Sequence, residues 1–235
     1  MLLTSERARQ LLAKSEAVLD GHFVGTNGNH LSLYVAKDRA TRFPSVVSEL
    51  CLGIAEQHAK SNIEAVVAPA IGGVALSQWT AYHLSLLRPD LPEVLALYTE
   101  HQEEARDMIG LAPGEQMILR KPEFVLKRGF GADVKDKRVL VVEDVLTTGR
   151  SAAQTIQVVR ANHGIFVSLG VLANGGNVTA RDMGIDWFGS LVKIDRQIFT
   201  EEDCAHHGLC AQGVPINTDF GHGKSFLARK QGAAS

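Results

Sequence analysis

The sequence predicts an α/β fold, in which a doubly wound and mostly parallel sheet lies between layers of helices. The first observation is a set of short, largely apolar runs, among them residues 63–68, 139–142 and 165–172, which are typical of strands buried on both faces. The second is that segments with helical periodicity separate these runs. The third is a length of 235 residues without a Pro- or Ser-rich linker, which fits one domain.

The expected elements run from an N-terminal helix to a polar tail. Residues 4–19 carry apolar side chains at helical spacing up to Leu19, and Thr4 or Ser5 can cap this helix. Further helices are expected at residues 44–59, 72–86 and 150–162, and strands at residues 30–36, 63–68, 95–98, 139–142, 165–172 and 187–192. The tail, residues 195–235, is rich in polar residues, glycine, histidine and cysteine, which indicates loops and short elements.

Composition and charge argue against several classes of protein. The 24 Lys and Arg residues nearly balance the 26 Asp and Glu residues, so no overall attraction to nucleic acid or to a membrane surface is expected. No apolar run reaches the ~18–20 residues that a bilayer span requires, and the N-terminus turns polar at once, unlike a signal peptide. The 3 cysteines are too few for a disulfide scaffold. We therefore expect a cytoplasmic protein that binds neither nucleic acid nor membrane.

The strongest motif begins at the apolar run 139–142. Two acids, Glu143 and Asp144, follow this strand, and the next positions lead into a helix: Val145, Leu146, Thr147, Thr148, Gly149, Arg150 and Ser151. Ligands of open α/β sheets bind at the carboxyl ends of the strands, and a helix N-terminus presents free N–H groups to a phosphate. Two acids beside a phosphate site suit a ligand that also carries vicinal hydroxyls or bound Mg²⁺.

This run resembles the signature for 5-phosphoribosyl 1-pyrophosphate (PRPP) in type I phosphoribosyltransferases. That signature is four hydrophobic residues, two acids, two small or apolar residues and Thr-Thr-Gly, and here it lies between a strand and a helix. The resemblance implies the type I phosphoribosyltransferase fold, with Glu143 and Asp144 accepting hydrogen bonds from the ribose 2- and 3-hydroxyls. It also implies that residues 147–151 hold the 5-phosphate and that Mg²⁺ bridges pyrophosphate and ribose.

A second loop rich in glycine follows the strand expected at residues 63–68. Its centre is Ala70, Ile71, Gly72 and Gly73, where consecutive N–H groups can point toward an anion. The loop is similar to the pyrophosphate loop of the same family, whose members hold an unusual peptide conformation there. The resemblance therefore implies that these four residues bind the pyrophosphate of PRPP.

The connection at residues 100–128 is long and basic. Loops of this length in compact domains are usually lids or disordered segments. Leu126 to Phe130, read together with the motif at residues 138–145, resembles a stretch of orotate phosphoribosyltransferases, in which the preceding loop closes over the site and supplies cations to pyrophosphate across a homodimer interface. We expect Arg120 and Lys121 to be catalytic and Lys127 to bind substrate. The cation that contacts pyrophosphate is left open among His101, Arg106, Arg120 and Lys121.

The N-terminal segment, residues 21–35, resembles the opening of the same enzymes, where a turn lies in a hood over the base. Gly28 and Tyr34 match this pattern, whereas Asn27 replaces the usual serine. The resemblance implies that His30 contacts the base. We expect a single phosphoribosyltransferase domain, residues 1–235, with a core of residues 43–194 and a hood made of residues 1–42 and 195–235.

Cysteine and histidine gather near the C-terminus. Cys204, His207 and Cys210 are candidate ligands for Zn²⁺, and His206 or His222 is a candidate for a fourth ligand. The alternative interpretation is a pair of reduced cysteines with histidines on the surface. No other protein-bound metal is expected, because the resemblance implies that Mg²⁺ arrives with the substrate.

The base that is accepted depends on an arginine that the sequence lacks. Relatives place an orotate-pairing arginine directly after the strand expected at residues 165–172, but here Asn174 and Gly175 follow, and Arg181 is a possible substitute. Three functions are considered. The favoured one is transfer of phosphoribosyl from PRPP to orotate, giving orotidine 5′-phosphate and pyrophosphate in pyrimidine biosynthesis. The others are transfer to a purine or another nucleobase, and sensing of PRPP or a nucleotide with little activity.

Overall fold

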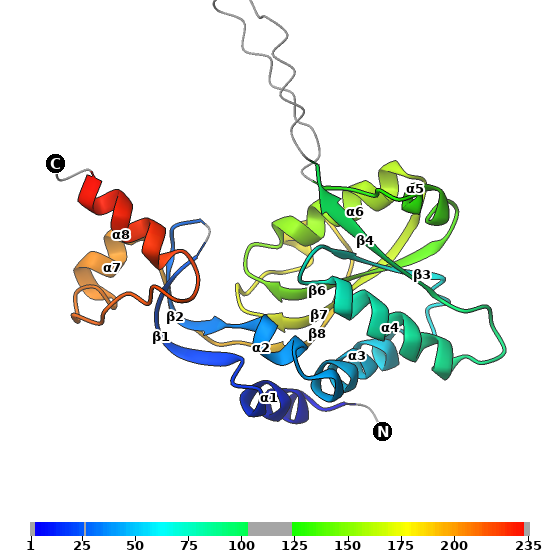
Figure 1. Ribbon diagram of the computed structural model, residues 1–235, viewed down its shortest axis with the longest axis horizontal. Helices are drawn as coiled ribbons and strands as arrows, with labels where there is room; N and C mark the ends of the chain where they lie inside the picture. The colour runs from blue at the N-terminus through cyan, green and yellow to red at the C-terminus, as the bar shows by residue number, and fades with distance from the viewer. Residues whose placement is uncertain (1–2, 26, 103–123, 233–235) are drawn as a thin grey trace, which may run out of the picture.

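A six-stranded sheet forms the centre of the computed structural model, which describes residues 3–25, 27–102 and 124–232 (Figure 1). The strand order is β5-β4-β3-β6-β7-β8. Five of these strands are parallel, and only the short outer strand pairs antiparallel with its neighbour. The bounds are β3 (Ala65–Pro69), β4 (Leu95–His101), β5 (Phe124–Val125), β6 (Arg138–Leu146), β7 (Ile165–Asn174) and β8 (Phe188–Lys193). The predicted doubly wound α/β fold class is confirmed.

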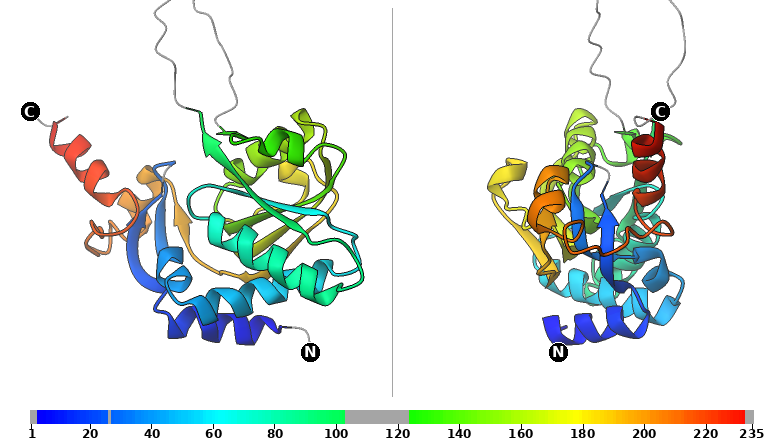
Figure 2. Two further views of the ribbon diagram at one scale, coloured as in Figure 1. Left: turned by 45° about the vertical axis from the view of Figure 1, so that its right-hand side comes forward. Right: turned by 90° about the vertical axis from the view of Figure 1, so that its left-hand side faces the viewer.

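Helices cover both faces of this sheet (Figure 2). The helices α3 (Pro44–His58) and α4 (Val74–Leu87) pack on one face, whereas α5 (Phe130–Asp133) and α6 (Arg150–Ala161) pack on the other. Because both faces are covered, Val139 to Val142 in β6 are completely buried, which explains their unbroken apolar run. Among the described residues, no helix has both the length and the apolar character needed to cross a bilayer.

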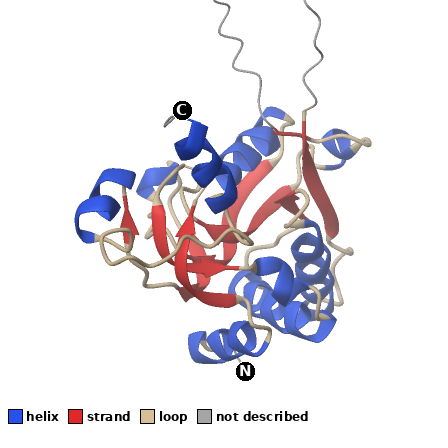
Figure 3. Ribbon diagram, turned by 60° about the vertical axis from the view of Figure 1, so that its left-hand side comes forward, coloured by secondary structure: helices blue, strands red, loops and turns tan. Residues whose placement is uncertain are grey.

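A second, smaller sheet joins the two ends of the chain. Its strands are β1 (Val18–Val24), β2 (His30–Val35) and β9 (Ile198–Phe199), and both pairings are antiparallel. The helices α7 (Glu201–His207) and α8 (Gly223–Gly232) contact this sheet, and the short α2 (Lys37–Thr41) leads from it to α3. The terminal helices of the described chain, α1 (Ser5–Lys14) and α8, lie well apart (Figure 1 and Figure 3).

The N-terminal helix differs from the expectation in length and in packing. The helix α1 (Ser5–Lys14) is capped by the Thr4 side chain, which accepts a hydrogen bond from the Arg7 N–H. It ends before Glu16, whose φ of 54° is left-handed, so Leu19 lies in β1 rather than on a helix. The buried face of α1 joins the main core cluster, so this part of the expected hood packs with the core.

Candidate active site

The two acids of the strongest motif lie at the carboxyl end of β6 and are nearly buried. Glu143 is 5% exposed and Asp144 is 8% exposed. Burial raises the pKa of Glu143 well above its ordinary value, and the adjacent Asp144 carboxylate raises it further. Burial also raises the pKa of Asp144, although the Lys37 ammonium opposes this effect. Carboxylates that are buried away from water are stabilised most by a ligand that offers hydroxyl donors or positive charge.

Lys37, at the start of α2, is a site residue that the sequence analysis missed. Its Nζ lies 3.1 Å from Oδ2 of Asp144. Burial by itself lowers the pKa of Lys37, but the carboxylates of Asp144, Asp38 and Glu143 together outweigh this effect and the net pKa is raised. A Cβ at Gly72 would overlap the Lys37 ammonium, so glycine leaves room for the lysine beside the second loop. A single lysine after a strand carries no motif, and only the fold brings it to β6.

The turn after β6 forms a small polar cavity at the N-terminus of α6. Gly149 adopts a left-handed φ of 75°, and the helix begins at the next residue. A cavity of ≈ 120 Å³ is lined by Glu143 together with the turn, residues 145–151. The predicted phosphate-binding residues therefore surround one cavity, into which the free N–H groups of a helix N-terminus can point.

The second loop lies next to the first. Ala70, Ile71 and Gly72 line a cavity of ≈ 280 Å³ whose other side is formed by Glu143, Asp144 and the start of α6. The Ala70–Ile71 peptide bond is cis. Gly73 is buried and does not line this cavity, and a Cβ there would come within 2.6 Å of the Ala68 Cβ. The structure thus brings the two predicted anion-binding loops together around the acids.

The basic connection is only partly described. His101, at the end of β4, lines the cavity beside the second loop. The Nζ atom of Lys127 instead lies 3.7 Å from Oε2 of Glu100, and the Nε atom of Arg128 lies 2.7 Å from Oε1 of the same carboxylate. Lys127 is not among the residues that line the cavities around the acids. Three other predicted cations lie outside the described residues: Arg106, Arg120 and Lys121.

A third cavity separates the acids from the small sheet. It has a volume of ≈ 190 Å³, and its polar lining includes Tyr34, Lys37, Asp144 and Arg196. Arg196 donates from Nη1 to the Leu33 carbonyl at 3.3 Å. Its Nε and Nη2 are buried and have no hydrogen-bond partner among the described residues.

The Arg196 guanidinium lies beside Gly175, one of the residues at which the expected arginine is missing from the sequence. A Cβ at Gly175 would lie 3.2 Å from Cζ of Arg196, so glycine admits the guanidinium from the neighbouring chain segment. Arg181, the possible substitute, is exposed in a short 3-10 helix and is absent from the lining of this cavity. Sequence reasoning missed Arg196 because it follows β8, a different strand from the one after which the arginine was expected.

His30, which the sequence analysis expected to contact the base, lies outside the three cavities around the acids. Its ring is completely buried, its Nδ1 lies 2.6 Å from Nε2 of His22, and it is not among the residues that line the cavity at the small sheet. The predicted zinc ligands also require a correction. Cys204 and Cys210 do lie together, but His207 is exposed, and the histidines beside the two thiols are His22 and His30. The reason is tertiary: β1 and β2 carry these two rings beneath α7.

The amino-acid sequence is similar to those of known phosphoribosyltransferases. Residues 41–202 match the family model described as phosphoribosyl transferase domain. The orotate phosphoribosyltransferase of Thermotoga maritima is 32% identical over 209 residues, covering 88% of this chain and 94% of that protein. The enzyme of the same name from Carboxydothermus hydrogenoformans is also 32% identical, covering 88% of this chain and 93% of that protein.

The fold of this chain is similar to those of solved protein structures. The orotate phosphoribosyltransferase of Aeropyrum pernix superposes with a TM-score of 0.54 at 26% identity, covering 79% of this chain and 92% of that one. The Mycobacterium tuberculosis orotate phosphoribosyltransferase crystallised with Fe(III) dicitrate has a TM-score of 0.56 at 20% identity, covering 80% of this chain and 97% of that one. At this lower identity the second likeness concerns the fold.

Proposed function

The chain belongs to the orotate phosphoribosyltransferase family, and on that premise we propose that it transfers the phosphoribosyl group of PRPP to orotate. The products are orotidine 5′-phosphate and pyrophosphate. The proposal is supported by three adjoining cavities around Glu143 and Asp144. Glu143 lines both the cavity at the N-terminus of α6 and the cavity at the second loop. Lys37 and Asp144 line both the cavity at the second loop and the cavity at the small sheet.

Each part of PRPP has a counterpart in this arrangement. The 5-phosphate binds the N–H groups of residues 147–151, and the ribose hydroxyls donate to Glu143 and Asp144. The pyrophosphate binds the second loop beside Lys37, and the base enters the cavity at the small sheet. The anomeric carbon then lies between the leaving pyrophosphate and the base, which an in-line displacement requires.

The reaction needs charge stabilisation and positioning rather than a covalent intermediate. The C1–O bond to pyrophosphate breaks, the ring becomes oxocarbenium-like, and a ring nitrogen of orotate forms the new bond to C1 as its N–H proton passes to the released pyrophosphate or to solvent. Lys37 and the loop N–H groups stabilise the charge that grows on pyrophosphate, and the carboxylates hold the ribose. Oxygen ligands such as these carboxylates suit Mg²⁺, which carries positive charge to the pyrophosphate when it enters with PRPP.

The observation that carries the choice of base is the state of Arg196. Burial lowers the pKa of this guanidinium, because too little negative charge surrounds it to replace the lost water. Two of its nitrogens are buried without a partner among the described residues. A carboxylate in the cavity would supply both the charge and the acceptors, as a bidentate pair. Orotate carries such a carboxylate, whereas uracil and the purines do not.

Pyrophosphate release in the presence of PRPP and Mg²⁺ tests the proposal. Orotate, uracil, adenine, hypoxanthine, guanine and xanthine are offered separately, and turnover with orotate alone is expected. Turnover with a purine alone, or PRPP binding without turnover on any base, would instead favour one of the two other functions considered from the sequence.

The Arg196→Ala variant tests how the base is recognised. We expect kcat/KM for orotate to fall about 10- to 100-fold, since a hydrogen bond to a charged group contributes about 1.5–3 kcal/mol, while the KM for PRPP changes little. Arg181→Ala, which removes an exposed arginine, is the matched control and should leave both constants unchanged. An equal loss for the two substrates in Arg196→Ala would contradict the assignment to the base.

The resemblance of residues 126–130 and 138–145 to orotate phosphoribosyltransferases also leads us to propose a homodimer. In this dimer the basic connection, residues 100–128, is shared across the interface. Sedimentation of the purified protein over a range of concentrations measures the mass of the particle. A monomer at concentrations at which the enzyme is fully active would refute the shared loop, because each site would then be complete within one chain.

A further inference from the structure

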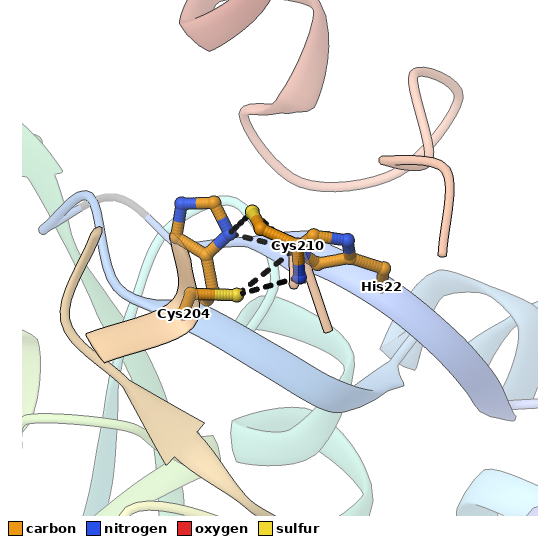
Figure 4. Close-up of side chains that lie close together, drawn as sticks. His22, Cys204 and Cys210 are labelled. Carbon is orange, nitrogen blue, oxygen red and sulfur yellow. Dashed lines mark hydrogen bonds between the residues drawn. The ribbon is translucent and has the colours of Figure 1, made fainter. Parts of the chain in front are cut away.

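Two histidines and two cysteines from distant parts of the chain meet beneath α7. His22 lies on β1, His30 on β2, Cys204 on α7, and Cys210 in the segment after it. One ligand atom from each side chain lies within 4.8 Å of the corresponding atom of every other. The sulfur atoms of both cysteines turn toward the His22 ring (Figure 4). All three cysteines of the chain lie in the described part and are free thiols.

The spacing of these atoms suits a tetrahedral metal ion. The Cys204 and Cys210 sulfurs lie 3.6 and 3.8 Å from His22 Nε2, and the Cys210 sulfur lies 3.6 Å from His30 Nδ1. With Zn–S about 2.3 Å and Zn–N about 2.0–2.1 Å, each edge from sulfur to nitrogen in a tetrahedron measures about 3.6 Å. The two nitrogens are closer, at 2.6 Å, so the rings need to separate by less than about 1 Å to reach the corresponding edge.

Neighbouring groups already orient the ligand atoms. The Val214 carbonyl lies 2.7 Å from Nδ1 of His22, and because a carbonyl only accepts, Nδ1 carries the proton and Nε2 presents a lone pair to the thiols. The Cys204 sulfur accepts the Cys210 backbone N–H at 3.2 Å. The other nitrogen of His30 is buried without a partner among the described residues, so the polar contacts of this ring lie within the cluster.

From this geometry we propose that His22, His30, Cys204 and Cys210 bind one structural Zn²⁺ ion. Two thiolates and two imidazoles are a typical ligand set for zinc, and four protein ligands leave no position open for a substrate. Closed sites of this kind stabilise a fold rather than perform chemistry. The ion ties the segment after β9 to the hairpin of β1 and β2.

The proposed zinc site lies close in sequence to residues that line the cavity at the small sheet. Val24, Gly25 and Leu31, which follow His22 and His30 closely in sequence, line one wall of that cavity. Gly221 and His222, which follow Cys210, line another. Loss of the ion should therefore loosen the walls that face the base, whereas the two anion-binding loops lie on other elements.

Zinc content is the direct test and does not depend on any enzymatic activity. Protein purified under reducing conditions from zinc-supplemented cells is analysed by inductively coupled plasma mass spectrometry, and about one zinc per chain is expected. Cys204→Ser and Cys210→Ser should each bind zinc more than about tenfold more weakly, because even groups that only orient a ligand contribute that much. His207→Ala is the matched control on the same helix and should keep its zinc, because His207 is exposed and lies outside the cluster.

A second measurement on the unaltered protein covers the case in which the cysteine variants fail to fold. Zinc is removed with a chelator and replaced by Co²⁺, whose absorption should show the intense visible bands of a tetrahedral site and thiolate-to-metal charge transfer. The His207→Ala spectrum should be identical. Protein without zinc that also gives no such Co²⁺ spectrum would overturn the proposal. Loss of zinc from His207→Ala would do the same.

Discussion

His58 provides a prediction about stability whose magnitude can be worked out in advance. The side chain is completely buried near the end of α3, where its ring contacts Trp187. The Ile54 carbonyl lies 3.1 Å from Nδ1 and must accept its proton, while Nε2 lies 3.3 Å from the Ser168 hydroxyl. Burial lowers the pKa of His58 from 6.5 to about 4. The folded protein therefore keeps this ring neutral at a pH at which the unfolded chain protonates it.

The sign and size of the effect follow from proton linkage. The unfolded state binds the additional proton below about pH 6.5, so the stabilisation is fully present above that pH and is lost as the pH falls toward 4. The whole difference in pKa corresponds to about 3 kcal/mol. At pH 5.5 about nine-tenths of the unfolded chains but few folded molecules are protonated at this site, which gives a loss of about 1.4 kcal/mol.

Urea denaturation of the natural protein and of His58→Gln at pH 7.5 and 5.5 measures this loss. Glutamine retains a donor for the Ile54 carbonyl and does not titrate. The free energy of unfolding should fall by about 1.4 kcal/mol more in the natural protein than in the variant between the two pH values. Other titrating groups contribute equally to both proteins and cancel. Equal losses of unfolding free energy in the two proteins would refute the reasoning. The control variant His206→Gln replaces an exposed histidine and should lose as much unfolding free energy as the natural protein does.

Two further predictions concern the active site. A Cβ at Gly176 would overlap the Thr147 carbonyl oxygen and lie 2.6 Å from its carbon, so Gly176→Ala must displace the phosphate turn. We expect it to raise the KM for PRPP about 5- to 100-fold, since overpacking costs about 1–3 kcal/mol; Gly232→Ala, with open space around the new Cβ, should have no effect. Asp144→Asn should lower kcat about 100-fold or more in steady-state assays, because it removes the charge that faces Lys37 and that we propose holds the ribose. Unchanged turnover with a native circular dichroism spectrum would contradict the placement of the ribose.

Local chemistry explains why the sheet and the positions of the two loops could be predicted. An apolar run such as residues 139–142 must be buried on both faces, and the polar residues that follow a parallel strand must lie at its carboxyl end. The phosphate turn and the second loop depend on residues that are consecutive in the chain. The end of the first helix was less predictable, because the apolar pattern continues through Leu19 although the backbone turns at Glu16.

The side chains that complete the sites could not be predicted in this way, because they come from elements far apart in sequence. Lys37 reaches Asp144 across more than 100 positions, and Arg196 reaches the cavity from beyond β8. His22 and His30 lie beside the cysteines because the hairpin pairs with β9, which precedes α7.

The sequence by itself therefore determined the fold class, the positions of the two loops after β3 and β6, and the family. Each of these depends on contiguous residues whose conformation and burial follow from local periodicity, glycine and the position after a strand. Only the tertiary structure decided which lysine faces Asp144, which arginine lines the cavity at the small sheet, and which histidines join Cys204 and Cys210. The reason is physical: a pairing between distant side chains is set by how helices and sheets pack, and no local pattern in the chain encodes that packing.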